Sequence, residues 1–511
     1  MKKLIAVILL LVAWPVSAAD VNGYTAKYEC KAGGANCNVA VATYTTAACA
    51  QTITTADTAG AIESKLNGGS SPICIANGDY TGKGTINISA SGTSGAYRVL
   101  RYYRSGDNDD EPWNQTSENQ AKLERLVVNG SYWIVHRVTW PALSSGLDSP
   151  VRIEVGNHTT TNIIFNRIAL FGSGPPSGYR YYGISQDCTG AGAYSDITLQ
   201  NSVLGGYYGN LTTDDAVLVD MQCVTNGRIV NNELYDWGGG IIQYGSNSGG
   251  SRAGSVIENN DCYYSSLALT TGNTRMKGEG CISYKQSGTS GSPAQIIHNR
   301  IWTMRVWDGA FCCNGSSGSA VGLGAGSGVN ADYINFQNNI VWDSQVGIEW
   351  TMWNYPGGTA NNNSVIGNII YDIQKFYASN SSSALWAGQY GVNTTETYLN
   401  TIIKSVDWYA DGNFNTNNDF RCNVTISSGT NNSTSGTGTQ WDYNVYYGST
   451  HSGETNKITN TLQTRANSQA YTLGQIIRTT VTPPGSGAAG DFLYKVTTAG
   501  TSAGSPPSYT T

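Results

Sequence analysis

The sequence predicts an all-β solenoid, a parallel β-helix, and two recurring patterns predict it. In the first pattern, alternating apolar residues lead to an asparagine, and another apolar residue follows two places further on. The pattern recurs at intervals of roughly 30 to 40 residues, which is typical of a solenoid. Because equivalent positions of stacked coils lie above one another, we expect the side-chain amides to form a hydrogen-bonded ladder. The asparagines concerned are Asn166, Asn201, Asn232, Asn260, Asn299, Asn338 and Asn368.

The second pattern lies between these segments and consists of a glycine followed by small or apolar residues. We expect each coil to hold at least two strands separated by turns. Nothing in this region keeps a 3.6-residue apolar period over three turns, which argues against helical repeats. The pattern occurs at residues 183–184, 240–242, 280–282, 309–311 and 347–348.

Residues 1–19 are typical of a bacterial-type secretory signal peptide. Lys2 and Lys3 precede an apolar run over 4–13, and Val16-Ser17-Ala18 offers a cleavage site. The run is too short to cross a bilayer comfortably, Pro15 interrupts it, and no later stretch could span a membrane. We therefore expect a secreted protein, located outside the cell, in the periplasm or on the cell surface.

Residues 20–72 are expected to form an N-terminal cap tied by disulfides. The chain has 11 cysteines, which in an exported protein favour disulfides over a zinc site. Connectivity cannot be derived from spacing, and one cysteine must stay unpaired within the chain. Four cysteines cluster near the cap, and two further pairs could bridge neighbouring coils. They are Cys30, Cys37, Cys49 and Cys74 in the cluster, and Cys188 with Cys223 and Cys262 with Cys281 in the pairs.

A short helix is expected over 56–66, near the end of the cap. Thr54, Thr55 or Thr58 could cap its start, and the glycines at 68 and 69 would end it. We expect this helix to cover the first coil, which would otherwise expose its core and strand edges.

From residue 73 onward the chain alternates apolar strands with turns such as Asn77-Gly78-Asp79-Tyr80, and it continues in this way through 97–103 and 126–140. In this pattern the chain resembles the pectate-lyase-like superfamily of right-handed parallel β-helix proteins, over residues 73–450. The resemblance implies a right-handed β-helix and an activity of the polysaccharide lyase or hydrolase type. Loop insertions are expected at 173–180, 245–255, 315–329 and 354–363, and the last coils near 402–423 and 441–448.

Residues 466–511 differ in character and are expected to form a small β module. Its pattern is similar to modules of phage tail proteins and secreted carbohydrate-active proteins. In those proteins further strands usually follow, whereas this sequence stops at Thr511. The module is therefore either incomplete or only superficially similar.

Charge and architecture together favour a polysaccharide partner. The net charge is −6, and without Lys2 and Lys3 there are 27 basic and 35 acidic residues, or −8. This argues against nucleic acid, whose phosphates need basic patches. A β-helix fills its interior with side chains, so a ligand must lie along the outside of one sheet, which suits an extended polymer.

Lyases of the resembled superfamily remove a proton beside a uronate carboxylate, which requires a base and cationic groups that stabilise the enolate. Catalytic candidates are Lys285, Arg305 and Asp308, which could equally be solvated residues at the rim of the coils. Candidates for substrate binding are Tyr244, Tyr284, Trp307, Glu349, Trp353 and Tyr355.

The resemblance also implies a calcium ion held by carboxylates, for which Asp214, Asp215 and Asp236 are candidates, with Asp220 nearby. The alternative interpretation is that Asp214 and Asp215 belong to a polar turn that binds no metal ion. Hydrolysis would need two carboxylates facing one groove, as Asp214-Asp215 with Asp236 or Glu279 with Asp308 and Glu349 could supply. The Gly-His-Gly and Arg-Ile-Lys motifs of polygalacturonase-like hydrolases are missing, so a lyase is favoured.

The sequence therefore predicts a secreted β-helix protein that acts on or binds an extracellular polysaccharide, as a lyase on an acidic glycan. Two alternatives stay open. One is a non-catalytic glycan-binding adhesin or tail-like surface protein, and the other is a structural surface protein. Oligomeric state is undetermined, since tail-type β-helices trimerise but no coiled-coil segment is present.

Overall fold

A computed structural model describes the chain from residue 49 to 501 in segments. They are 49–102, 121–141, 151–172, 182–186, 194–206, 217–237, 240–244, 254–265, 280–304, 319–323, 330–350, 360–373, 383–387, 392–426, 440–447 and the short strands between 458 and 501, less residues 157–158, 223, 404, 406 and 411–413. The predicted signal peptide lies outside these residues.

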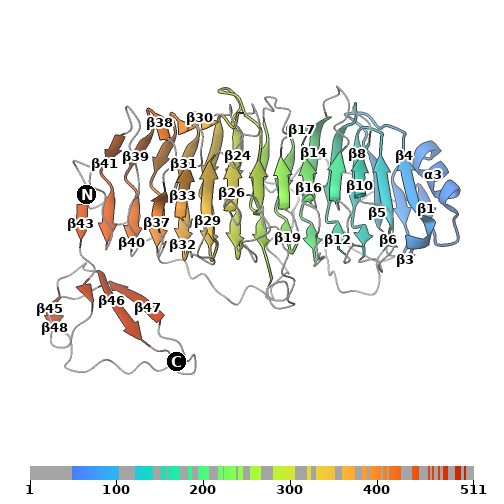
Figure 1. Ribbon diagram of the computed structural model, residues 1–511. Helices are drawn as coiled ribbons and strands as arrows, with labels where there is room; N and C mark the ends of the chain where they lie inside the picture. The colour runs from blue at the N-terminus through green and yellow to red at the C-terminus, as the bar shows by residue number, and fades with distance from the viewer. Residues whose placement is uncertain are drawn as a thin grey trace, which may run out of the picture.

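The molecule is a right-handed parallel β-helix built from three long sheets, here called A, B and C (Figure 1). A complete coil contributes one strand to each sheet in that order, for example β14 (Tyr194–Gln200), β15 (Val203–Gly205) and β16 (Val217–Met221), whereas the last coils show strands of sheets A and B only among the described residues. Each strand pairs in parallel with the equivalent strand of the next coil. The sequence predicted at least two strands a coil, and the structure has three.

Sheet A contains 15 strands. Besides β14 they are β1 (Gln51–Ile53), β2 (Ile73–Ile75), β5 (Arg98–Tyr102), β8 (Trp133–His136), β11 (Thr161–Asn166), β17 (Val224–Thr225), β18 (Arg228–Val230), β21 (Val256–Glu258), β24 (Ala294–Ile297), β27 (Ile334–Gln337), β31 (Ser364–Ile366), β35 (Glu396–Tyr398), β39 (Asp419–Arg421) and β41 (Gln440–Asp442).

Sheet B contains 14 strands. Besides β15 they are β3 (Gly78–Asp79), β6 (Ala121–Lys122), β9 (Thr139–Trp140), β12 (Ala169–Phe171), β19 (Glu233–Tyr235), β22 (Asp261–Tyr263), β25 (Arg300–Trp302), β28 (Ile340–Trp342), β32 (Ile369–Tyr371), β36 (Thr401–Ile403), β40 (Val424–Ile426), β42 (Val445–Tyr447) and β43 (Ile458–Asn460).

Sheet C contains 11 strands. Besides β16 they are β4 (Thr85–Ile88), β7 (Arg125–Val128), β10 (Val151–Val155), β13 (Tyr182–Gln186), β20 (Gly240–Tyr244), β23 (Ile282–Tyr284), β26 (Ser319–Leu323), β29 (Val346–Trp350), β33 (Ser383–Ala387) and β37 (Asp407–Ala410). A small fourth sheet joins β30 (Ala360–Asn361), β34 (Val392–Asn393) and β38 (Phe414–Thr416).

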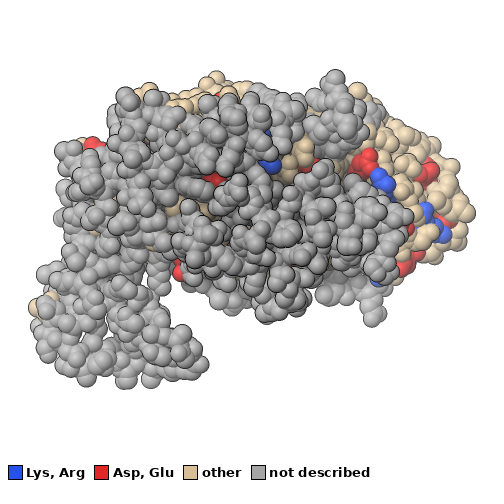
Figure 2. Space-filling view, in the orientation of Figure 1, with Lys and Arg blue, Asp and Glu red and all other residues tan. Residues whose placement is uncertain are grey.

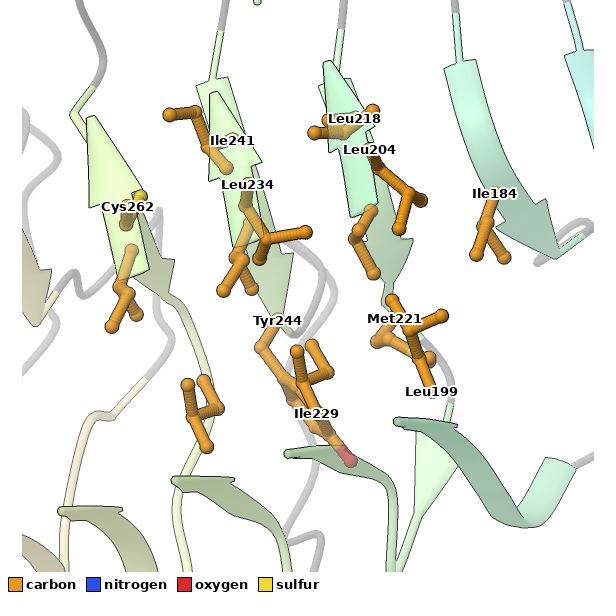
Figure 3. Packing of buried hydrophobic residues seen from close by; sticks show 14 of the residues in the cluster. Ile184, Leu199, Leu204, Leu218, Met221, Ile229, Leu234, Ile241, Tyr244 and Cys262 are labelled. Atoms are coloured by element: carbon orange, nitrogen blue, oxygen red, sulfur yellow. The ribbon is translucent and has the colours of Figure 1, made fainter. Parts of the chain in front are cut away.

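The interior of the coils is one continuous apolar core. Side chains alternate between the two faces of a strand, so the tube is filled largely by every second residue; where the strands of sheet C begin, two adjacent residues such as Leu218 and Val219 both enter the core. Figure 3 shows Leu199 and Ile229 of sheet A, Leu234 of sheet B and Met221 of sheet C converging there, all fully buried.

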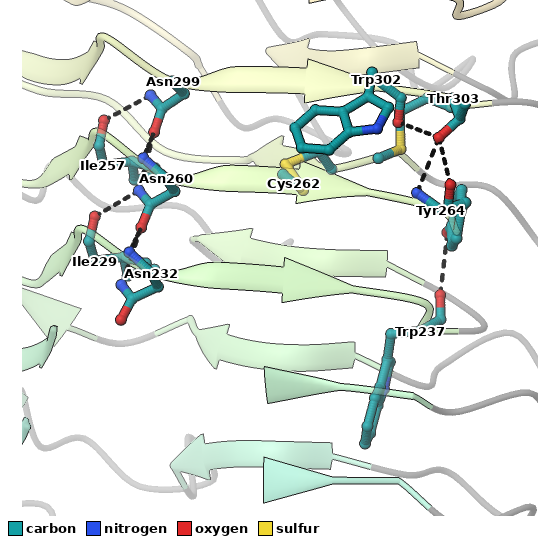
Figure 4. Close-up of a disulfide and its surroundings, with 12 residues drawn as sticks. Ile229, Asn232, Trp237, Ile257, Asn260, Cys262, Tyr264, Asn299, Trp302 and Thr303 are labelled. Atoms are coloured by element: carbon teal, nitrogen blue, oxygen red, sulfur yellow. Dashed lines mark hydrogen bonds between the residues drawn. A yellow bond between two sulfur atoms is a disulfide. The ribbon is translucent and has the colours of Figure 1, made fainter. Parts of the chain in front are cut away.

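Except between β5 and β6, sheets A and B are joined by turns of two residues, and from β18 onward these turns hold the asparagine ladder. The first turn residue has a left-handed backbone, such as Asn259 with φ 54°. The second residue is the buried ladder residue. Asn260, for example, donates to the carbonyl oxygen of Ile229 (2.8 Å) and to Oδ1 of Asn299 (2.9 Å), as Figure 4 shows. The ladder residues are Asn232, Asn260, Asn299, Asn339, Asn368, Asn400, Asn423 and Asn444.

The predicted ladder is therefore right at Asn232, Asn260, Asn299 and Asn368. Asn166 and Asn201 lie outside this column, but the Asn201 amide donates to Oδ1 of Asn166 at 2.9 Å in the neighbouring coil, so amide stacking holds there too. Asn201 and Asn338 are the left-handed residues that precede the ladder position, with φ 53° and 56°. Asn166 ends β11, where its amide contacts Nδ1 of His136. Asparagine suits the left-handed conformation better than most residues. It therefore occurs at the first turn position as well as at the ladder position, and the sequence pattern does not distinguish the two.

The N-terminal cap contains the predicted helix, observed as α3 (Ala59–Gly68). The Thr58 hydroxyl caps it by accepting from the Ala61 amide at 3.2 Å. Ile62 and Leu66 are buried against the first coil, and Figure 1 shows α3 at that end of the tube beside β1 and β4. A disulfide joins Cys49 to Cys74 of β2. Basic and acidic side chains are interspersed on this end of the molecule (Figure 2).

Two predicted insertions are in part regular structure. Segment 315–329 contains β26, an internal strand of sheet C, and segment 354–363 contains β30. Small residues and glycines dominate Ser319–Leu323, so its strand pattern was weak. Segment 173–180, most of segment 245–255 and the glycine segment 309–311 lie outside the described residues.

The described strands of the solenoid extend from β1 to β43, a little beyond the predicted range 73–450. The C-terminal region then forms short strands, as predicted. They are β44 (Gln463–Thr464), β45 (Ala470–Tyr471), β46 (Ile476–Val481), β47 (Gly490–Lys495) and β48 (Gly500–Thr501), with β46 antiparallel to β47 and β45 antiparallel to β48. Among the described residues, no helix is long and apolar enough to cross a bilayer.

Candidate functional site

The outer face of sheet C is the best-placed surface for a ligand. Apart from residues 103–120, which connect β5 to β6, the connections from sheet A to sheet B are turns of two residues, as between Gln200 and Val203. The longer connections therefore run from sheet B to sheet C and from sheet C to the next sheet A, as over 206–216 and 245–255. Long connections of a solenoid usually carry its binding residues, and here they flank sheet C.

One row of residues runs along this outer face, at one position of each strand. On β16, Val219 and Met221 belong to the core, so Asp220 between them points outward. Register places Asp220 beside Gln243, Gln243 beside Ser283, Ser283 beside Gly322 and Gly322 beside Glu349. In the other direction the row continues through Ser185 to Glu154. We call these seven residues the outer row of sheet C.

Asp220 is the group in this row whose chemistry stands out. It faces away from the core, yet only 4% of its surface is exposed. Burial raises its pKa to about 7, against the opposing effects of hydrogen bonds from Gln222 and Ser185 and of the Lys285 charge. Gln222 Nε2 donates to its Oδ2 at 3.1 Å and the Ser185 hydroxyl at 3.4 Å. Its other oxygen, Oδ1, accepts no hydrogen bond from the described residues.

Lys285, predicted as catalytic, lies on the same face. It follows β23, two residues after Ser283, and its backbone amide donates to the Tyr244 carbonyl oxygen at 2.6 Å. Its positive charge acts on Asp220, two strands away. It is 8% exposed, so it is not the freely solvated rim residue of the alternative interpretation. A carboxyl group with a pKa near 7, within the electrostatic influence of an ammonium group two strands away, forms the core of a candidate active site.

Tyr244 and Tyr284, predicted to bind substrate, are core residues instead. Both are fully buried inside the tube, with their rings stacked at a centroid distance of 5.3 Å. The Tyr244 hydroxyl accepts from the Gly227 amide and donates to the Val224 carbonyl oxygen, so it ties sheet C to sheet A from within (Figure 3 shows Tyr244). These side chains are inaccessible to a polymer on the outside.

Glu349 belongs to the outer row and is 1% exposed. It lies four strand steps from Asp220, which at about 4.8 Å a step is roughly 19 Å. That is at least twice the separation of roughly 6.5 to 9.5 Å between the two carboxyl groups of an inverting glycosidase. Asp220 and Glu349 therefore do not form a hydrolytic pair.

The predicted calcium site is only partly described. Asp236 is fully buried at the end of sheet B, where its carboxylate accepts from the amide and hydroxyl of Ser265 at 2.6 and 2.5 Å. Among the described residues, no group of three or more His, Cys, Asp or Glu side chains could hold a metal ion. Asp214 and Asp215 lie outside those residues, as do Arg305, Trp307, Asp308, Trp353 and Tyr355.

The outer face of sheet B also carries polar and aromatic side chains, but they contact one another. Five rings stack in a column at centroid distances from 4.4 to 5.7 Å, so their faces are covered by neighbouring rings. Burial raises the pKa of Glu233 to about 7, and this carboxyl accepts from the Tyr263 hydroxyl. Arg300 pairs with Asp261. The ring column consists of Tyr235, Tyr263, Trp302, Trp342 and Tyr371.

Sequence reasoning considered Asp220 only as a metal ligand and did not consider Ser283. A signal for Asp220 was present, because it is a carboxylate inside the otherwise apolar strand Val217–Met221. An ionisable residue in such a run is either costly or functional.

No protein-family model and no curated protein matches the chain. Solved structures are similar to it in fold. A mannuronic acid specific polysaccharide family 6 lyase from human gut microbiota is 13% identical, with a TM-score of 0.45 over 78% of this chain and 86% of that chain. An alginate lyase from Paenibacillus sp. is 14% identical, with a TM-score of 0.36 over 71% and 97%. The A-module of a mannuronan C-5 epimerase from Azotobacter vinelandii is 13% identical, with a TM-score of 0.36 over 78% and 93%. At this level of similarity, the function must be argued from the chain's own residues.

Proposed function

We propose that this chain is a secreted polysaccharide lyase that cleaves an acidic glycan on the outer face of sheet C. Asp220 and Lys285 are the catalytic residues of the proposal. The observation that carries it is a desolvated carboxyl group with a pKa of about 7 that feels the charge of a buried lysine two strands away, on a sheet with longer connections on both sides.

The proposed reaction is a β-elimination on a uronate residue. The Asp220 carboxylate takes the proton from C5, and the Lys285 ammonium stabilises the negative charge that develops on the uronate carboxyl group. The electron pair of the C5–H bond forms the C4–C5 double bond, and the bond from C4 to the glycosidic oxygen breaks. Asp220 returns its proton to the leaving oxygen. Atoms and charge balance, and the carboxylate is regenerated.

A pKa near 7 suits this role because a general base is most effective when its pKa lies close to the working pH. The low exposure of Asp220 and Lys285 adds to the effect, since charge interactions are stronger where water is excluded. We also propose calcium as a cofactor, because carboxylate oxygens are suitable ligands for Ca²⁺. Two of the three candidate ligands, Asp214 and Asp215, lie outside the described residues.

The test is an activity assay on alginate, pectate and chondroitin that follows the ultraviolet absorbance of the unsaturated product. Wild type is expected to give product on at least one polymer. Lys285→Ala should reduce kcat by about 10²- to 10³-fold, the loss typical of a removed charge-stabilising group. Lys83→Ala, a half-buried lysine of η2 (Thr81–Lys83) in the cap, is the matched control and should leave the rate unchanged. No product on any acidic polymer would remove the lyase proposal.

A second candidate function is inverting hydrolysis, favoured by the place of Glu154. This carboxylate lies two strand steps from Asp220 in the same row, about 9.5 Å, at the upper end of the inverting range. Glu154 already forms an ion pair with Arg125. Hydrolysis would release reducing ends without any unsaturated product, so the same assay with a reducing-sugar readout separates the two reactions.

A further inference from the structure

The outer row of sheet C contains a second set of features that the proposed reaction does not use. We propose that Ser283 and Gly322 form a sugar-binding subsite, which takes a pyranose ring through one of its hydroxyl groups beside the reacting residue. This inference rests on the proposed function in placing the polymer on this face.

The first observation is the Ser283 hydroxyl. Ser283 is the central residue of β23, between the core residues Ile282 and Tyr284, so its side chain points outward. It is 2% exposed, and its Oγ makes no hydrogen bond with any residue that the structure describes. Buried hydroxyls are normally paired. A hydroxyl left without a partner on a candidate binding face is therefore suited to a ligand group.

The second observation is the absence of a side chain at the next position of the row. Ser283 is in register with Gly322 of β26, and Gly322 is in register with Glu349 of β29. Glycine inside a strand weakens it and often marks a close approach by a ligand. The outer row therefore carries no side chain at the position between Ser283 and Glu349.

The third observation is the position of the subsite relative to the proposed catalytic residues. Ser283 is two strand steps from Asp220, about 9.5 Å, and Lys285 follows it by two residues on the same face. Asp220 Oδ1 and Ser283 Oγ are also the two side-chain atoms of the outer row that are buried without a hydrogen-bond partner among the described residues. A polymer lying along the row would meet Asp220 first and, two strands further on, Ser283 and Lys285 together, followed by Gly322 on the next strand.

The chemistry of the subsite differs from that of the catalytic pair. A serine hydroxyl both donates and accepts, so it matches a sugar hydroxyl, which does the same, and does not discriminate by charge. We therefore assign charge recognition to Lys285 and recognition of a neutral ring hydroxyl to Ser283.

Ser283→Ala tests this directly by calorimetric binding of oligosaccharides from alginate, pectate and chondroitin in turn. Loss of one hydrogen bond predicts a Kd roughly 5-fold higher. Because the removed hydroxyl has no hydrogen-bond partner among the described residues, the melting temperature should stay the same or rise. Ser364→Ala on β31, whose hydroxyl accepts from Gln337 Nε2, is the control and should leave binding unchanged.

Gly322→Ala adds one methyl group at this position of the outer row and should weaken binding at least as much. Gly82→Ala in the cap, where an added methyl meets nothing within 4 Å, is its control. Wild-type affinity in both Ser283→Ala and Gly322→Ala would overturn the subsite, as would failure of the wild type to bind any of the three oligosaccharides. Binding that is lost in Ser283→Ala, without unsaturated product in the wild type, would keep the subsite and remove only the lyase reaction.

Discussion

Asp220 is a carboxyl group that the fold retains at a cost in stability. Its folded pKa of about 7 lies above the value of about 3.8 expected when it is exposed. Below about pH 4 both states are protonated and the group has no effect. As pH rises from 4 to 7 the unfolded chain loses its proton first, so the folded state becomes progressively less favoured.

Asp220→Asn should therefore stabilise the protein at pH 8 while abolishing elimination. With a shift of about 3 pKa units, the free energy of unfolding could rise by up to about 4 kcal/mol, less whatever the amide loses in hydrogen bonding. Urea unfolding at pH 5 and pH 8 measures this, with the larger gain at pH 8. In Asp79 the Thr81 hydroxyl lowers the pKa instead, so Asp79→Asn should bring no gain. An equally large gain at both pH values would contradict the explanation.

A single carboxyl that both takes and returns the proton also sets the stereochemistry. The proton leaves C5 and arrives at the oxygen on C4 from the same side of the ring. Mannuronate and glucuronate carry these two groups on the same face, whereas guluronate and galacturonate carry them on opposite faces. We expect mannuronate-rich alginate to be cleaved faster than pectate. The ratio of their kcat/KM values measures this, and preferential cleavage of pectate would contradict the role of Asp220 as sole proton carrier.

The ladder provides a matched pair of neighbouring asparagines with opposite expectations. Asn339 donates to Ile296, Gln337 and Asn368 and accepts from the amide and side chain of Asn299. Asn339→Ala leaves several buried groups unpaired and should cost about 2 to 4 kcal/mol of unfolding free energy. Its neighbour Asn338 has a left-handed backbone, so Asn338→Gly should be close to neutral.

Chemical denaturation of the two variants side by side measures this difference. Equal costs would mean that the turn geometry is wrong. The pair also explains the limit of the sequence prediction. The period of the solenoid was readable because asparagine recurs, but asparagine serves both turn positions, so the sequence alone did not decide which of two adjacent amides is stacked.

At the scale of elements, the disulfide between Cys262 of β22 and Cys281 links sheets B and C inside the core (Figure 4). From the sequence alone this pair could bridge neighbouring coils, but the structure places the disulfide within one coil, between β22 and the residue that precedes β23. The disulfide closes a separation of 19 residues, and removing such a link typically costs about 3 kcal/mol. The double variant Cys262→Ala/Cys281→Ala should lose this amount in urea unfolding, whereas Cys422→Ala, at a free cysteine, should lose far less. Equal losses would show that the link contributes little.

Elements with strong local signals were predictable and those without were missed. The helix α3 carries a threonine cap, apolar spacing and terminal glycines, all of which act within a few residues. In contrast, β26 consists largely of small residues and lies within a glycine-rich stretch, so only its pairing with β23 and β29 identifies it as a strand. Parallel pairing is a long-range property that local sequence does not carry.

At the scale of the whole molecule, the sequence predicted a tube whose function must lie on its outside, but not the face concerned. The choice of sheet C depends on which turns are short, and this requires the three-sheet register. The two tyrosines proposed to bind substrate show the same limit, because period-2 alternation indicates two faces without telling which one is the interior. Lys285 could be located next to a strand from sequence because it follows the recognisable pattern at residues 280–282, and its role as a catalytic residue stays a prediction.

The central claim is that an acidic polymer lies along the outer row of sheet C. A crystal structure of the Lys285→Ala variant soaked with an alginate oligosaccharide tests it most directly. The expected result is sugar density beside Asp220, Gln243 and Ser283, with a uronate residue within hydrogen-bonding distance of Asp220 Oδ1. Density on sheet A or on the ring column of sheet B, with the outer row of sheet C left empty, would contradict it.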